Sequence, residues 1–292
     1  PLPSGRSLAV FFYDAPVSQA VAFENLLENG DSFSDRLLGA FDGDREQPQL
    51  VHIATDGETY GHHHRHGDMA LAFALQGIEN GSLARIVNYG QFLELHPPTH
   101  EVEIREDTAW SCAHGVERWK SDCGCASGLN PDWNQAWRGP LRDALNRLRD
   151  RLRPVFEEAA EYFFRDPWDA RNGYIQVLLA PGREAEGRFL EAHACRRLSG
   201  VEQRKAINLM ELQRYAMLMF TSCGWFFDDL AGLEGVQILR YAGRAIQLAE
   251  ELFGTGFTEP FLTDLEPALS NDPEAGTGRQ VYEEKVAPLR SR

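Results

Sequence analysis

Hydrophobic and polar positions follow two different patterns along the chain, and the pattern changes near residue 138. Before that point, short apolar runs predict four β-strands, and helical spacing of apolar residues predicts two helices. Strands that alternate with helices are typical of parallel α/β units, so we expect an α/β region here. The predicted strands are Leu8–Tyr13, Leu50–Thr55, Ala84–Asn88 and Glu101–Arg105, and the predicted helices are Ser18–Asn29 and Asp68–Gly77.

From Pro140 onward the pattern predicts helices almost throughout. Leu141, Leu145, Leu148 and Leu152 repeat at helical spacing, and Pro154 is expected to restart or kink that helix. Further helices are predicted at Pro167–Leu179, Glu184–Leu198, Gln203–Ser222, Leu233–Phe253 and Glu259–Ser270. The expected fold class is therefore α/β followed by all-α, with domains at residues 1–138 and 139–292.

Four strands cannot close a barrel, because even a small barrel needs about eight. We therefore expect the first region to be the C-terminal part of a barrel that an upstream segment of the same parent protein completes.

The charge of the chain narrows its choice of partners. With 44 acidic and 29 basic residues, the net charge is −15, which repels nucleic-acid phosphates and anionic lipids. No apolar run approaches the roughly 20 residues of a membrane span. Five cysteines cannot all pair, and reduced thiols are expected. These features predict a cytoplasmic protein without nucleic-acid or membrane partners.

The densest chemistry lies at residues 51–68, VHIATDGETYGHHHRHGD. Asp56 ends the predicted buried strand, the position where α/β folds place catalytic groups. Glu58 lies two residues later. If strand geometry persists, the two carboxyls point to the same side with α-carbons about 6 to 7 Å apart, a spacing near that of glycosidase carboxyl pairs. Alternatively, Glu58 caps a loop or pairs with Arg65.

Two clusters could bind a metal ion. His62, His63, His64 and His66 are nearly contiguous, but adjacent side chains diverge, so we favour pocket lining or recognition of sugar hydroxyls. The residues Cys112, His114, Cys123 and Cys125 are all zinc-compatible, but their spacing is not that of a C-x-x-C knuckle. A bound zinc and a loop with buried thiols both remain open, and no metal or cofactor is included in the predicted site.

The tryptophans near this second cluster indicate a sugar site. Trp110 and Trp119 lie in a loop-like stretch, and flat apolar rings beside polar groups suit stacking on sugar rings. We expect Trp133 and Trp137, which lie close to the first long helix, to belong to the core.

These motifs resemble a known family. TDGETYGHHHRHGD resembles the fourth motif of glycoside hydrolase family 57, in which Asp-x-Glu-x-x-Gly-His ends a barrel strand. FFYDAPVSQAVAF looks like the preceding strand of that family, and AWSCAHGVERW looks like its later tryptophan loop. The full sequence, including WNQAWR and MLMFTSCGWFFDD, is similar to a domain of unknown function (DUF3536 type) that follows family 57 catalytic regions.

The resemblance implies a (β/α)7-type barrel and a retaining enzyme acting on α-glucans, either a hydrolase or a glucanotransferase. It makes Asp56 the general acid/base and implies a nucleophilic glutamate upstream of this chain. The candidate substrate-binding residues are Glu58, His62, His63, Trp110, His114, Trp119 and Asp14.

The expected partners are an oligosaccharide or polysaccharide substrate and the upstream barrel segment. We expect the isolated chain to be inactive. The alternatives are a non-catalytic carbohydrate-binding or scaffolding domain and, less favoured, a zinc-binding protein.

Overall fold

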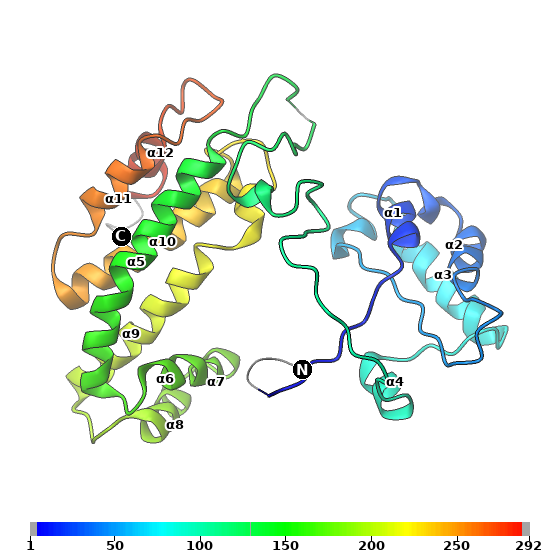
Figure 1. The fold of residues 1–292 in the computed structure, drawn as a ribbon, viewed down its shortest axis with the longest axis horizontal. Coiled ribbons are helices and arrows are strands. Elements are labelled where there is room, and N and C mark those ends of the chain that lie inside the picture. Colours follow the sequence, from blue (N-terminus) through cyan, green and yellow to red (C-terminus); the bar gives the residue numbers. More distant parts are fainter. Residues whose placement is uncertain (1–4, 129, 288–292) are drawn as a thin grey trace. The chain divides into compact units, whose positions relative to one another are not determined.

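The structure is a computed structural model that describes residues 5–128 and 130–287. The chain divides into two compact units, the first ending at Ile104 and the second beginning at Arg105. The predicted boundary after residue 138 falls inside the second unit. The helices of both units are labelled in Figure 1.

Short helices and long connections make up the first unit. Its elements are α1 (Ala15–Phe23), η1 (Leu26–Glu28), α2 (Gly30–Leu38), η2 (Gly57–Thr59), α3 (Gly67–Asn80) and α4 (Tyr89–Leu95). A small core forms where α2 packs against α3, with α1 and η1 beside them. That core contains Val21, Leu27, Phe33, Ala70 and Ala74.

The predicted α/β region, the C-terminal part of a (β/α)7-type barrel, is wrong. The described residues contain isolated β-bridges but no β-sheet, and their regular structure is helical. The four segments predicted as strands pair in no ladder. Several of their apolar side chains stay in solvent, as Leu8 (75% exposed), Phe12 (71%) and Ile104 (71%) show, whereas Ile53 of the second segment packs against the small core. An apolar run predicts a buried strand only where neighbouring strands take up its backbone hydrogen bonds, and here none do.

The second unit is a helical assembly. Its long helices are α5 (Arg138–Phe163), α9 (Gly200–Leu218) and α10 (Leu233–Phe253), and α9 packs along α10 (Figure 1). The shorter elements are η3 (Glu117–Trp119), α6 (Pro167–Gly173), α7 (Ile175–Leu179), α8 (Arg183–His193), η4 (Ser222–Trp225), α11 (Thr258–Leu265) and α12 (Gly278–Lys285).

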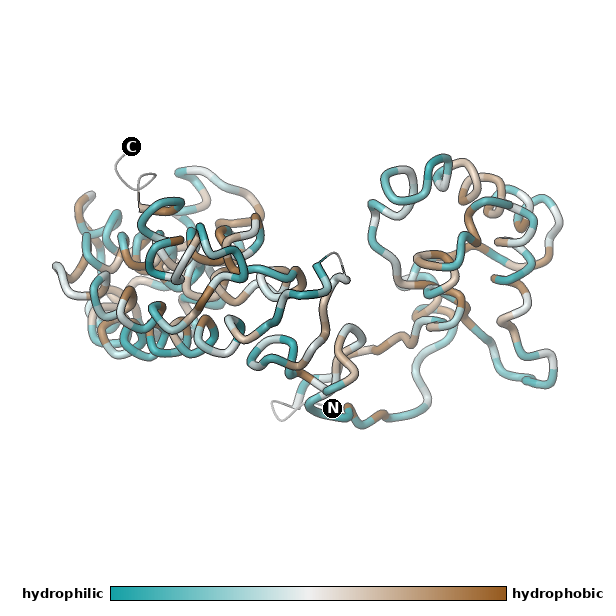
Figure 2. The backbone as a smooth tube through the Cα atoms, turned by 90° about the horizontal axis from the view of Figure 1, so that it is seen from above, coloured by the Kyte–Doolittle hydropathy of each residue, from teal (hydrophilic) through white to brown (hydrophobic). Residues whose placement is uncertain are grey.

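The leucine repeat of the sequence forms the centre of this unit. Leu141, Leu145, Leu148 and Leu152 on α5 are at most 1% exposed, and they pack with buried residues of α9, α10 and α11. Hydrophobic and hydrophilic residues alternate along the helical tubes in Figure 2, as expected of helices with one apolar face. Trp137 is buried as predicted, whereas Trp133 is only partly covered.

Most predicted helices of the second region are confirmed, and α10 has the predicted bounds. Pro154 lies inside α5, and the helix continues through it to Phe163. In the described part of the chain, no helix combines the length and the apolar character needed to cross a membrane.

Candidate functional site

Asp14 and Asp56, two of the predicted site residues, belong to chain segments that lie side by side in the first unit. The backbone N–H of Asp14 donates to the carbonyl of His52 at 2.8 Å, so the segment leading to Asp56 runs beside the start of α1. The carboxylate of Asp14 accepts a hydrogen bond from the backbone N–H of Val17 at 2.8 Å. Asp14 is therefore the N-cap of α1, which gives its side chain a structural role.

The loop that follows Asp56 has a tightly bonded backbone. The N–H groups of His62 and His63 both donate to the carbonyl of Glu58, at 3.1 and 3.0 Å. The N–H of Thr59, which is 4% exposed, donates to the carbonyl of Asp56 at 3.1 Å. The ring of His64 reaches back to α1, with its Nε2 atom 3.0 Å from the carbonyl oxygen of Ala22. These bonds hold the loop against the small core.

The candidate side chains of this loop are exposed to solvent. Asp56, Glu58, His62 and His63 are all exposed. Among the described residues, neither carboxylate makes an ion pair, and the predicted alternative pair of Glu58 with Arg65 is not formed. The rings of His62 and His63 lie edge to face with centroids 5.0 Å apart. The 3₁₀ turn begins at Gly57, so the strand geometry assumed for the Asp56–Glu58 pair does not persist.

The predicted residues Trp110, His114 and Trp119 belong to the second unit. Trp110 is 77% exposed, and its ring meets the ring of Phe226 at a centroid distance of 6.3 Å. Trp119 meets the same ring at 6.0 Å and donates from Nε1 to the carbonyl of Ser222 at 3.2 Å. The structure thus groups the two tryptophans around Phe226. That Trp110 lines one pocket with Asp56 stays a prediction.

His114 lies beside the three cysteines that the sequence had singled out. Its Nδ1 atom is 3.5 Å from the Sγ atom of Cys125. Burial alone would raise the pKa of the Cys112 thiol. Backbone hydrogen bonds from His114 and Arg118, together with contacts to the other two thiols, outweigh this effect and lower the pKa to about 7. Burial and the neighbouring thiols raise the pKa of Cys125. The cysteines therefore form one interacting group.

Two arginines that sequence reasoning missed surround this group. Arg138 is completely buried and donates to the carbonyl of Cys125 at 2.9 Å. Arg118 donates to the carbonyls of Ser111 and Phe226, both at 3.0 Å. A signal for Arg138 existed, because it lies three residues before Leu141 and continues the buried face of α5. Arg118 carried no comparable signal.

The family comparison matches the helical part of the chain. Residues 133–292, more than half of the chain, match the family described as a domain of unknown function, DUF3536. The chain belongs to this family. The DUF3536 match begins after the cysteine cluster and includes all of α5 to α12. No curated protein and no solved structure matches the chain.

Proposed function

We propose that this chain is part of a family 57-type glycoside hydrolase or glucanotransferase that acts on α-glucans, with Asp56 as the general acid/base. The loop from Asp56 to His63 carries the proposal. Its backbone is fixed by hydrogen bonds, while Asp56, Glu58 and His62 are exposed and follow the Asp-x-Glu-x-x-Gly-His order of the family. A loop with a fixed backbone and exposed polar side chains can present those side chains to a ligand.

The DUF3536 match gives separate support. The sequence resembles the domains of this type that follow family 57 catalytic regions, and the match covers the helical part of the chain. The proposed arrangement therefore joins a carboxylate-bearing loop to an accompanying helical domain in one protein.

Two carboxyl groups divide the proposed chemistry. A glutamate outside these residues attacks the anomeric carbon, while Asp56 protonates the departing glycosidic oxygen. Asp56 then removes a proton from the incoming water or sugar hydroxyl, whose oxygen bonds to the anomeric carbon and displaces the glutamate as a free carboxylate. Water as the acceptor gives hydrolysis, and a sugar hydroxyl gives transfer. Glu58 and His62 bind sugar hydroxyls next to the cleaved bond.

The test compares single variants of the full-length protein that contains this chain. Asp56→Asn is expected to lower turnover of maltooligosaccharides by about 100-fold or more, because asparagine cannot exchange a proton. Glu58→Gln is expected to have a smaller effect. Asp68→Asn is the matched control, since Asp68 is an exposed acid that follows the motif. Reducing-sugar release and product length are the measurements.

The isolated chain of 292 residues is expected to show no turnover. Full activity of Asp56→Asn would overturn the catalytic assignment. Strong activity of the isolated chain would mean that a complete carboxylate pair lies within it.

A second candidate function is carbohydrate binding without turnover, which the exposed ring of Trp110 favours. Its contact with Phe226 holds the indole at the surface of the second unit, and stacking on sugars needs such a ring. Trp110→Ala is expected to weaken maltooligosaccharide binding to the isolated chain by about tenfold, measured by titration calorimetry. Tyr162→Ala, which removes another exposed ring, is the control. Equal binding by both variants would contradict a role for Trp110.

A further inference from the structure

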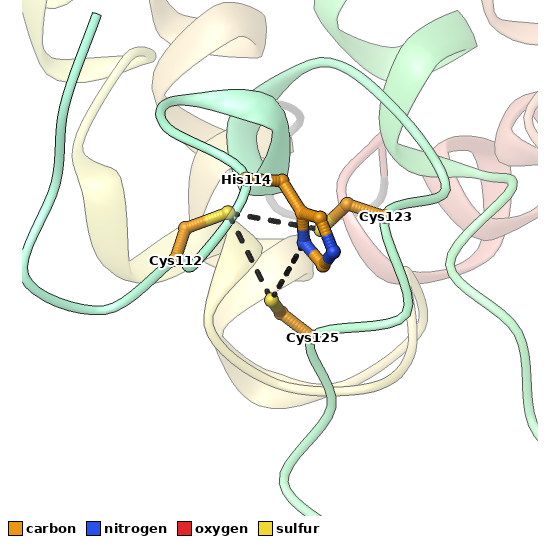
Figure 3. A group of neighbouring side chains, drawn as sticks. All are labelled: Cys112, His114, Cys123 and Cys125. Carbon is orange, nitrogen blue, oxygen red and sulfur yellow. Dashed lines mark hydrogen bonds between the residues drawn. The ribbon is translucent and has the colours of Figure 1, made fainter.

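Four side chains from two turns of the second unit converge on one point. Cys112, His114, Cys123 and Cys125 each offer one ligand atom, and these four atoms all lie within 4.8 Å of one another (Figure 3). Cys112 is buried and two of its partners, Cys123 and Cys125, are partly buried. Among the described residues, no other group of three or more histidines, cysteines and acids converges in this way. The cluster belongs to the second unit, whereas the loop around Asp56 belongs to the first.

Three of the six distances between the ligand atoms match the edges of a mononuclear tetrahedral site, and the others are no longer than 4.8 Å. The Sγ atom of Cys112 is 3.9 Å from that of Cys123 and 3.8 Å from that of Cys125. The Sγ atom of Cys125 is 3.5 Å from His114 Nδ1. With metal bonds of about 2.3 Å to sulfur and about 2.0 to 2.1 Å to nitrogen, a tetrahedral zinc site has edges of about 3.8 Å between sulfurs and about 3.6 Å from sulfur to nitrogen.

We propose that these four residues bind one Zn²⁺ ion in a closed structural site. Thiolate and imidazole ligands in tetrahedral geometry favour zinc among the common divalent ions. Four protein ligands leave no open position for water or substrate, so the ion holds the polypeptide together rather than acting on a ligand.

The buried arginine provides an independent argument for the ion. Arg138 is 0% exposed, and the buried Asp228 carboxylate attracts its guanidinium, although the two form no direct ion pair within the described residues. Its Nη1 atom lies 3.9 Å from Cys123 Sγ, and its Nε atom has no hydrogen-bond partner. A buried cation needs nearby negative charge. Three thiolates and one Zn²⁺ carry a net charge of −1, which adds to the negative charge that Asp228 provides near Arg138.

The backbone around the ligands needs glycine at two places. Gly115, directly after His114, has a φ of +80°, and a Cβ atom there would lie 2.3 Å from the carbonyl oxygen of Asp107. Gly124, between the last two cysteines, has a φ of +76°. These left-handed residues turn the chain so that both ends of the loop face the same point.

The site connects an irregular loop to the helical unit. Arg138 begins α5 and bonds to the carbonyl of Cys125, and Arg118 bonds to the carbonyl of Phe226, next to η4. The expected role of the ion is therefore to hold residues 112–125 against these helices, together with the tryptophans at 110 and 119.

The first test measures metal in the chain purified under reducing conditions. Inductively coupled plasma mass spectrometry is expected to find about one zinc ion per chain. X-ray absorption at the zinc edge is expected to show three sulfur ligands and one nitrogen ligand. Neither measurement needs catalytic activity, so the result is separate from that of the glycosidase test.

The second test uses cysteine variants with matched controls. Cys112→Ser, Cys123→Ser and Cys125→Ser are each expected to lower the zinc content at least about tenfold. Cys195→Ser and Cys223→Ser, which change exposed cysteines outside the cluster, are expected to keep it. His114→Cys is expected to retain zinc with four sulfur ligands, because a four-cysteine site is also a stable tetrahedral centre.

Any one of four results would overturn the proposal. The first is wild-type chain without zinc even after incubation with zinc salt and reductant. The second is equal loss of zinc in Cys195→Ser and Cys112→Ser. The third is iron in place of zinc, and the fourth is a disulfide between two cluster cysteines, each in protein purified under reducing conditions. The wild-type measurements keep the proposal testable even if a cysteine variant fails to fold.

Discussion

The buried guanidinium of Arg138 bonds at 2.9 Å to the carbonyl oxygen of Cys125, which joins the first turn of α5 to the loop that carries the cysteines. The Nη2 group of the same guanidinium donates a hydrogen bond to the carbonyl of Phe227 at 3.4 Å. One side chain therefore connects the start of α5 to a loop 13 residues before it and to a segment 89 residues after it.

Replacing Arg138 by methionine is expected to destabilise the chain. The substitution keeps most of the apolar stem but leaves two carbonyls without their charged donor, at a cost of about 3 kcal/mol in the free energy of unfolding. Urea denaturation followed by circular dichroism measures the change. Arg149→Met is the control, because Arg149 lies on the same helix with its side chain 48% exposed in a surface ion pair. Equal midpoints for both variants would contradict the bridging role of Arg138.

Two glycine substitutions distinguish the effect of an unfavourable φ angle from the effect of a steric clash between the added Cβ atom and the backbone. Gly115 and Gly124 both have positive φ, but only at Gly115 would a Cβ atom meet another backbone atom, at 2.3 Å from the oxygen of Asp107. At Gly124 the space around the added Cβ is open. Gly115→Ala is therefore expected to lower the melting temperature more than Gly124→Ala does, and to reduce zinc binding more strongly. Thermal unfolding and metal analysis check both effects, and the reverse order would refute the argument.

The start of α9 is expected to show a defined pH dependence. The hydrogen bond from Arg196 has the largest effect on the pKa of Glu202, and hydrogen bonds with Ser199 have the next largest. Together they lower this pKa from 4.5 to about 2. A carboxyl whose pKa is lower in the folded state stabilises the fold above its unfolded pKa, and this contribution is lost as the pH falls through the folded value. Glu202→Gln is therefore expected to be less stable than wild type at pH 7.

The difference between wild type and Glu202→Gln is expected to shrink between about pH 4.5 and pH 2. Melting temperatures across this range provide the measurement. Glu274→Gln, at an exposed acid in a turn, is the control. A difference that stays constant with pH would show that the ion pair and the capping box at Ser199 do not act in this way.

The helices after Pro140 could be predicted because their apolar faces are long and regular. The bounds of α10 follow from its sequence, since Gly232 and Gly254 flank an unbroken helical pattern. The short helix α4 was missed because the apolar run before it ends at Asn88, which caps the helix by accepting from Gln91 N–H at 2.8 Å. The predicted strands failed for a different reason, because an apolar run such as Leu8–Tyr13 does not specify the partner that a sheet requires.

The proposed zinc ligands also show how far the sequence alone could predict the structure. Their residue types were evident, but C-x-H and C-x-C are not the spacings of common zinc motifs. The convergence of the four side chains depends on the turn at Gly115 and on Arg138, which the spacing does not reveal. The Asp56 motif was recognised from its order of residues alone. That order fixes which groups are present, whereas the exposure of Asp56 and Glu58 follows from the turn that begins at Gly57.

The hydrogen-bonded turn from Asp56 to His64 also has an entropic consequence. Its backbone loses conformational freedom when the chain folds, so a ligand that binds there does not have to order the polypeptide. Only the rotamers of exposed side chains such as Glu58 and His62 become restricted on binding, at about 0.5 to 1.5 kcal/mol for each side chain. Weak individual contacts with a flexible, hydroxyl-rich ligand can then add up to measurable affinity, because few of them are offset by ordering of the loop.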